Sequence, residues 1–417
     1  MKDKTGALLR IGIAFFIWQA LDQWGRLIQP FMLWELQPQP DMFKVGVITT
    51  IGNICLLIGT FITGYLVDSA GTKFCAVMVC VVTAAYCLLT SQIRSLAIFC
   101  FCQLLRLCGN FQQITEAFVG SLHGEYDGKG RMRSLIWMGI PHGLALVIGP
   151  WMAGRSFELT NYDLHLSYAI SGVLMICALL PVMLFVVPEP RSHTAVQFGQ
   201  QLNQSPFVIY RQLLSNRALV KTLAFRFLVE APFQAYDQLG RFYFVSFLIE
   251  SPSDMSYIAI AIGLTTIFTN TVLIKPLQRN LSGQRLLQAS SAVLAVAYFL
   301  LASVDGYWKL MGILPIQVIG VTIAFAVLSA QVFGSVDSAH FGKAAGLGQS
   351  VTQLSAAIIP MIAGHFISAY EFSMLCYGSA VLSLLSVIMA HFFGHYMKQS
   401  VVELLPTGSY DGDYHLE

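Results

Sequence analysis

The chain has 417 residues, of which 56% are hydrophobic and only 11% are charged, and its mean hydropathy is +0.65. Soluble domains carry about 25% charged residues, so this composition excludes an ordinary soluble protein and predicts an all-α integral membrane protein that contacts the lipid bilayer. The net charge of +2 comes from bases spread along the chain, which argues against nucleic acid as a partner. The nine cysteines form no CxxC or Cys/His cluster, and we expect no metal and no cofactor.

Long apolar runs follow one another along the chain. A bilayer core of about 30 Å needs about 20 apolar residues per helix, so each such run predicts one membrane-spanning helix. Twelve runs qualify, at 7–32, 43–66, 74–92, 96–120, 134–154, 166–187, 219–248, 256–275, 285–303, 307–333, 345–369 and 372–396.

A polar stretch divides these runs into two sets of six. We therefore predict an N-terminal six-helix bundle at 1–187, a cytoplasmic linker at 188–218, a C-terminal six-helix bundle at 219–398 and a polar tail at 399–417. Most of the 24 Lys and Arg residues fall in predicted loops on the side of the N-terminus. By the positive-inside rule, both termini are cytoplasmic, in an inner or plasma membrane.

The two sets of six spans resemble each other in sequence. Asp22-Gln23-Trp24-Gly25-Arg26 in the first span returns as Asp237-Gln238-Leu239-Gly240-Arg241 in the seventh. In the same order along the chain, Arg106 aligns with Gln317, and residues 148–154 align with 358–364. This order predicts two parallel repeats related by an axis along the membrane normal.

A glycine-rich motif joins the second and third predicted spans. Gly64, Asp68, Gly71 and Lys73 occur at the spacing of the Gly-x-Leu-x-Asp-Arg-x-Gly-Arg-Lys loop of the major facilitator superfamily, which this segment resembles. Ser69 replaces the arginine of that pattern, so the gating loop implied by the resemblance has fewer charges. The resemblance implies the major facilitator fold, with twelve helices in two pseudo-symmetric bundles.

The fifth span carries a second motif. Its glycines and prolines resemble the Gly-x-x-x-Gly-Pro-x-x-Gly signature of the drug:proton antiporter branch of that superfamily, and Arg106 with Gly109 resembles the buried arginine element of the fourth span. Small residues allow close helix packing, and prolines bend helices. We therefore expect hinge or packing roles for Gly139, Pro141, Gly143, Gly149, Pro150, Gly154, Pro360 and Gly364.

Polar residues form stripes on three spans that line the central cavity in this superfamily. Their spacing of three and four places each stripe on one helix face, which must avoid lipid. The candidate cavity residues are Gln19, Gln23, Arg26, Arg106, Asn110, Gln113, Arg226, Gln234, Gln238, Arg241 and, in the tenth span, Gln317.

Four acidic residues in these spans are candidates for proton coupling. Asp22 precedes Arg26 by one helical turn, and Asp237 precedes Arg241 in the same way. Each acid either simply neutralises its own base or exchanges a proton when substrate competes for the arginine. Glu230 and Glu116 are alternative proton carriers.

The leading hypothesis is proton-coupled export of a small organic molecule by alternating access. The substrate is either a drug-like compound or a polar metabolite such as a siderophore. Import of a metabolite by a proton symporter or a uniporter is the alternative, and a non-transporting receptor is a weaker one. We expect a monomer without enzymatic activity, because the sequence contains no nucleophile–base pair, no metal-ligand spacing and no phosphate-binding loop.

Overall fold

A computed structural model describes residues 2–36, 41–122, 134, 137–185, 214–247, 251–335 and 341–402. Every regular element in these ranges is helical, which confirms the predicted all-α class. The helices of the first half are α1 (Lys2–Leu36), α2 (Met42–Ala70), α3 (Thr72–Ser91), α4 (Leu96–Cys102), η1 (Gln103–Cys108), α5 (Phe111–Leu122), α7 (Gly139–Leu159), α8 (Leu164–Cys177) and α9 (Leu179–Phe185).

The second half repeats this plan. Its helices are α12 (Arg217–Ala235), η2 (Tyr236–Gly240), α13 (Arg241–Phe247), α14 (Pro252–Phe268), η3 (Thr269–Leu273), α15 (Ile274–Asn280), α16 (Gly283–Leu301), α17 (Tyr307–Gly334), α18 (Phe341–Ala369) and α19 (Phe372–Val402). α19 therefore continues past residue 398, where the polar tail was predicted to begin. Most of the predicted linker, residues 188–213, lies outside the described ranges.

Within the described ranges, nine helices are long and apolar enough to cross a membrane. The three other predicted spans correspond to α4–η1–α5, α7 and α12–η2–α13. The first is interrupted, the second is rich in glycine and proline, and the third contains several charged residues. These are the spans whose sequences depart most from simple lipid-facing helices, and they contain much of the candidate site.

Four predicted spans are not continuous α-helices: the sixth is divided between α8 and α9, the eighth passes through the π-helical segment η3, and the fourth and seventh, which contain candidate site residues, are interrupted as follows. The fourth passes through the 3-10 segment η1 and leaves helical geometry at Gly109 and Asn110, where Asn110 accepts a hydrogen bond from the Gln113 amide and caps α5. A β-carbon added at Gly59 of α2 would lie 1.8 Å from the Leu107 carbonyl oxygen, so α2 lies directly against this segment. The seventh span contains the π-helical segment η2, shortly after Pro232, which lacks an amide hydrogen and interrupts the hydrogen-bond ladder.

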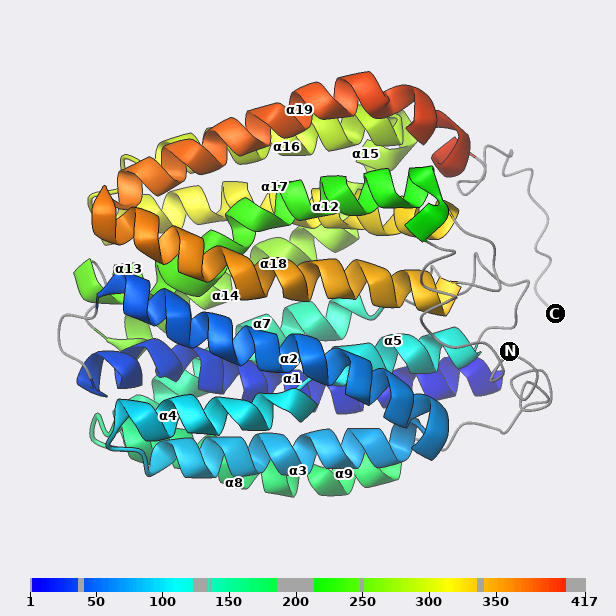
Figure 1. Ribbon diagram of the computed structural model, residues 1–417. Coiled ribbons are helices and arrows are strands. Elements are labelled where there is room, and N and C mark those ends of the chain that lie inside the picture. The colour runs from blue at the N-terminus through cyan, green and yellow to red at the C-terminus, as the bar shows by residue number, and fades with distance from the viewer. Residues whose placement is uncertain are drawn as a thin grey trace.

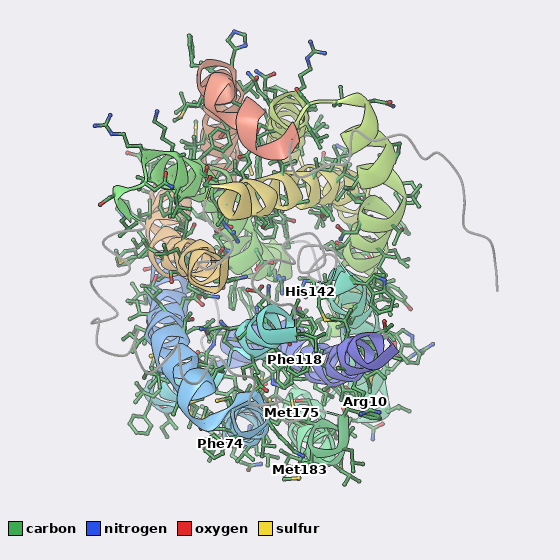
Figure 2. All side chains as sticks on the ribbon, turned by 90° about the vertical axis from the view of Figure 1, so that its right-hand side faces the viewer. Arg10, Phe74, Phe118, His142, Met175 and Met183 are labelled. Carbon is green, nitrogen blue, oxygen red and sulfur yellow. The ribbon has the colours of Figure 1, made fainter. Side chains whose placement is uncertain are left out.

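The helices run roughly side by side, and the two halves lie next to each other (Figure 1). α1 begins and α19 ends at the right-hand end of this view, which we name the termini end; the opposite end is the far end. Viewed from the termini end, the first half fills the lower part of Figure 2 and the second half the upper part. His142 of α7 lies near the boundary between the halves, whereas Met183 of α9 lies at the outer edge.

The halves meet along two helix pairs, α2 with α18 and α7 with α14. Glycines allow both contacts: a β-carbon at Gly46 would lie 2.4 Å from the Pro360 carbonyl oxygen, and one at Gly143 would lie 2.6 Å from the Ile267 side chain. In the middle of the α2–α18 pair, the buried Asn53 side chain donates a 2.6 Å hydrogen bond to a carbonyl oxygen of α18. Close backbone packing of this kind is the main attraction available between helices in lipid.

At the far end, a carboxylate and a hydroxyl join each of these pairs. Ser368 at the end of α18 donates a 2.7 Å hydrogen bond to Asp41, the N-cap of α2. Ser253 in the first turn of α14 donates a 3.0 Å hydrogen bond to Glu158 at the end of α7. In the α2–α18 contact the acid lies at the start of the first helix, whereas in the α7–α14 contact it lies at the end of α7 and the hydroxyl lies at the start of α14. The acid and the hydroxyl therefore occupy opposite positions in the two contacts. Both contacts link the two halves at the far end.

Candidate functional site

The repeated motif of the first span forms an ion pair inside α1. The Arg26 Nε atom lies 2.6 Å from the Asp22 Oδ2 atom, as the spacing of four residues predicts for a helix. The two side chains are 35% and 19% exposed, in a helix that packs against α5, α7, α8, α13 and α14. A β-carbon added at Gly25 would lie 3.3 Å from the Tyr168 hydroxyl oxygen, so this glycine lets α1 pack closely against α8.

Its counterpart in the second half forms the same ion pair in different backbone geometry. Arg241, the first residue of α13, donates a short hydrogen bond to Asp237 within the π-helical segment. The negative charge of Asp237 also acts on Arg26 across the boundary between the halves. We name Asp22, Arg26, Asp237 and Arg241 the central quartet; it contains two acids and two bases and is electrically neutral.

Arg106 lies in the 3-10 segment, and no carboxylate of the described residues forms an ion pair with it. Its guanidinium packs on bare backbone, since a β-carbon at Gly52 would lie 2.7 Å from Arg106 Nη1. The Oε1 atom of buried Gln103 lies at the same distance from that position and has no hydrogen-bond partner in the described structure. The segment therefore combines an unneutralised cation with an unused acceptor.

Gln317, which aligns with Arg106 by sequence, has surroundings that resemble those of Gln103. Gln317 lies beside Tyr298 of α16, as Gln103 lies beside Tyr86 of α3, where the amide donates a 3.1 Å hydrogen bond to the phenol. Arg106 thus has no charged equivalent in the second half.

The remaining candidate cavity residues differ in their surroundings. Gln19, Gln23 and Gln234 are buried. Gln23 packs where α1 meets α7, and Gln113 donates a 2.8 Å hydrogen bond to the Thr60 carbonyl of α2. Gln238 is half-buried beside Asp237 in the π-helical segment.

A second charged cluster lies nearer the termini end. Arg226 Nε is 2.7 Å from Glu230 Oε1, and Thr352 of α18 accepts from Arg226 Nη2 at 3.0 Å while donating to Glu230 Oε1 at 2.9 Å. Glu116 of α5 accepts a 2.9 Å hydrogen bond from Gln349 of α18, so this contact crosses between the halves.

Sequence reasoning missed Thr352 and Gln349 as members of the site. Both lie on α18, three residues apart, and the same spacing rule that identified the other stripes applies to them. The predicted stripes were restricted to the first, fourth and seventh spans, whereas α18 belongs to the eleventh. The structure brings α18 against both α12 and α5.

The predicted gating loop is mostly helix. α2 continues to Ala70, so Gly64 and Asp68 lie in its last turns, and their side chains lie outside the described set. Gly71 forms the junction with α3 at φ +90°, a conformation that glycine adopts without strain. Lys73 is half-buried in the first turn of α3.

The predicted hinge and packing residues lie at helix contacts. A β-carbon at Gly149 would lie 2.2 Å from a carbonyl oxygen of α1, one at Gly154 would lie 2.6 Å from the Ser256 hydroxyl, and one at Gly364 would lie 2.4 Å from a carbonyl oxygen of α2. Gly139 is less crowded, with an Asn270 atom at 3.8 Å. The helices α7 and α18 continue through their internal prolines, and Pro141 lies in the first turn of α7.

Comparisons with known proteins agree with this architecture. The family model for the Major Facilitator Superfamily matches residues 13–314. The fold is similar to that of the human organic anion transporter MFSD10 (TETRAN), with a TM-score of 0.68, 16% identity, and coverage of 92% of this chain and 99% of that chain. It is also similar to a POT family transporter in complex with a thioalcohol-conjugated peptide, with a TM-score of 0.72, 12% identity, and coverage of 94% and 96%.

The nucleoside transporter NupG gives a TM-score of 0.67 at 13% identity, with coverage of 93% of this chain and 99% of that chain. A comparison with the sequences of curated proteins gives no match. At 12–16% identity, the likeness to solved structures shows the fold alone. The family assignment rests on the family model, which covers well over half of the chain. This protein therefore belongs to the Major Facilitator Superfamily and is, by its fold, a secondary transporter.

Proposed function

We propose that this protein is a proton-coupled transporter that exports a small organic molecule, either a drug-like compound or a polar metabolite such as a siderophore. It works as a monomer by alternating access. It lies in an inner or plasma membrane, with both termini in the cytoplasm. Protons drive the cycle, and the acids of the helix stripes carry them.

The observation that carries this proposal is the central quartet. Two acid–base pairs from opposite halves lie inside membrane-spanning helices: Arg26 pairs with Asp22 in α1, and Arg241 pairs with Asp237 in the seventh span. Charges at membrane depth are expensive and commonly mark ion or substrate pathways. A substrate carboxylate that binds one arginine competes with its acid, so substrate and proton occupancy are linked.

The direction of transport rests on the fifth span. The spacing of its glycines and prolines resembles the drug:proton antiporter branch, which supports export, and α7 uses those glycines to contact α1 and α14. Arg106, which forms no ion pair with a carboxylate of the described residues, favours a substrate that carries an acidic group. The similar solved structures include transporters described for an organic anion, a peptide conjugate and a nucleoside.

Transport by the purified protein in liposomes tests this function. A thermal-shift screen of carboxylates, organic cations and siderophore-like chelators first selects a solute, because a bound ligand raises the melting temperature. Radiolabelled solute is then followed with and without an imposed pH gradient. We expect solute movement opposite to the proton gradient, and loss of gradient-driven movement in Asp22→Asn or Asp237→Asn. Flux that ignores the gradient in the wild type contradicts proton coupling.

The same assay decides the alternative direction. Solute that moves with protons identifies a symporter that imports a metabolite, and gradient-independent flux identifies a uniporter. Binding of the selected solute without any flux identifies a receptor that has kept the fold.

A further inference from the structure

Gln103 and Arg106 lie three residues apart in the 3-10 segment η1 of the fourth span. A 3-10 helix has about three residues per turn, so side chains at this spacing eclipse each other, whereas an α-helix would rotate them apart around its axis. The interruption of the span therefore places both side chains on one face, and that face packs against α2.

Gly52 of α2 is the point on which the two side chains converge. A β-carbon added there would lie 2.7 Å from Arg106 Nη1 and 2.7 Å from Gln103 Oε1, so these two atoms lie within twice that distance of each other. One oxygen atom at hydrogen-bond distance from both atoms can bridge a gap of this size. Such an oxygen has to accept from the guanidinium and donate to the amide, as a hydroxyl does.

The Gln103 amide is oriented so that its oxygen is unused. Its Nε2 atom donates a 3.1 Å hydrogen bond to the Tyr86 hydroxyl of α3. Gln103 is 1% exposed, and its Oε1 atom has no hydrogen-bond partner among the described residues. A buried acceptor without a partner is costly, so a ligand that supplies the donor binds more tightly than an analogue without it.

Arg106 adds a requirement for negative charge. It is half-buried, and no carboxylate in the described ranges forms an ion pair with it. A guanidinium at membrane depth avoids lipid, and it binds carboxylates through charge-assisted hydrogen bonds. The same charge repels an ammonium group, so the donor that suits Gln103 beside Arg106 is a neutral hydroxyl.

We propose that Gln103 and Arg106 recognise an α-hydroxycarboxylate. The carboxylate binds the Arg106 guanidinium, and the neighbouring hydroxyl accepts from Arg106 and donates to Gln103 Oε1. This inference rests on the proposed function and deepens it, because it names the substrate class of the same cavity. Gln103 is the specificity-determining residue, since it distinguishes acids that carry this hydroxyl from acids that lack it. Tyr86 is a positioning residue that orients the Gln103 amide.

Three acids with one carbon skeleton test the recognition chemistry. Malate carries the hydroxyl, aspartate carries an ammonium group in its place, and succinate carries neither. Mandelate with phenylacetate and citrate with tricarballylate are further pairs that differ only in the hydroxyl. Dissociation constants are measured by calorimetry on the purified protein in lipid nanodiscs, without a pH gradient.

We expect the hydroxy acid to bind about 5- to 150-fold more tightly than its partner in at least one pair, the range that corresponds to an unpaired buried acceptor. Aspartate should bind no more tightly than succinate. The proposal is overturned if no pair shows this preference, if none of the acids binds, or if aspartate binds more tightly than malate.

Matched variants assign the preference to the Gln103 oxygen. Gln103→Leu removes Oε1 together with the hydrogen bond to Tyr86, whereas Tyr86→Phe removes only that hydrogen bond. With the preferred pair of acids, we expect the two affinities to become equal in Gln103→Leu and to remain different in Tyr86→Phe. A preference that persists in Gln103→Leu, or that is lost equally in both variants, overturns the role of Oε1.

Gly52→Ala tests the site without removing any polar atom. The atoms that its β-carbon meets end flexible side chains, so we expect a folded protein in which Arg106 Nη1 and Gln103 Oε1 are displaced. Binding of the preferred hydroxy acid should weaken, and its advantage over its partner should disappear. Gly312→Ala is the control, because its β-carbon meets nothing within 4 Å. Equal binding in the two variants contradicts the site.

The liposome assay separates this inference from the proposed function. If a hydroxy acid is preferred but its flux ignores the pH gradient, proton coupling fails and the recognition site stands. If another solute is driven by the gradient and no hydroxy acid is preferred over its partner, only the recognition site fails.

Discussion

Replacing Gly46 by alanine tests how the far end closes. The added β-carbon would lie 2.4 Å from the Pro360 carbonyl oxygen, whereas ordinary contact begins at 3.4 Å, so α2 and α18 must separate by about 1 Å. Overpacking of this kind costs about 1–3 kcal/mol. Since the two helices belong to opposite halves, the cost applies only while the far end is closed. The gain in helix propensity applies to both conformations and cancels.

A preference of about 1–3 kcal/mol changes the ratio of open to closed far end by about 5- to 150-fold. Hydrogen exchange measures this ratio at the Phe43 amide, which donates to Asp41 and to Ser368 at the closed end. When opening is fast compared with exchange, the exchange rate of this amide rises by the same factor.

Two further variants make the result interpretable. Gly364→Ala places a β-carbon 2.4 Å from the Met42 carbonyl oxygen in the same interface, so we expect it to act like Gly46→Ala. Gly312→Ala is the matched control, because its β-carbon meets nothing within 4 Å. Equal Phe43 exchange rates in Gly46→Ala and Gly312→Ala refute the closed-end reasoning.

Three other predictions concern the same packing. Gly149→Ala places a β-carbon 2.2 Å from a carbonyl oxygen of α1 within the first half, so it should lower the melting temperature without changing far-end exchange. Asn53→Ala removes a buried hydrogen bond between the halves. Because a hydrogen bond between membrane helices contributes about 0.6–2 kcal/mol, its loss should speed far-end exchange about 3- to 30-fold. The hydrogen bond from Ser368, followed by that from the Phe43 amide, lowers the pKa of Asp41 below its ordinary value. The Asp41–Ser368 contact is therefore fully formed above the ordinary pKa of an aspartate and is lost only as the pH falls through the lowered pKa of Asp41. Asp41→Ala should accordingly speed far-end exchange by the same factor, relative to the wild type at the same pH, at every pH from about 5 to 8.

Local features of the site followed from the sequence. Asp22 with Arg26, Asp237 with Arg241 and Arg226 with Glu230 are each separated by four residues, and a helix brings such residues together whatever surrounds it. The twelve spans were also predictable, because the length and apolarity of a membrane helix are set by the bilayer rather than by its neighbours.

Departures from regular helix were not predictable in the same way. The 3-10 segment around Arg106 forms where Gly59 of α2 lies against the Leu107 carbonyl, which is a contact between residues distant in sequence. The fourth span was predicted at 96–120, and its 3-10 interruption did not follow from the sequence. The two copies of the repeated motif also differ, since one lies in an α-helix and the other in a π-helical segment after Pro232.

Hydropathy and helical spacing are properties of the local chain, so the membrane class, the sequence repeat and the acid–base pairs of the repeated motif could be predicted without the fold. Only the tertiary structure decided which helices join the halves. It placed Thr352 and Gln349 of α18 against Glu230 and Glu116, and it closed the far end through Ser368. These contacts depend on how close two distant backbones come, and that distance is set by small residues on both helices at once.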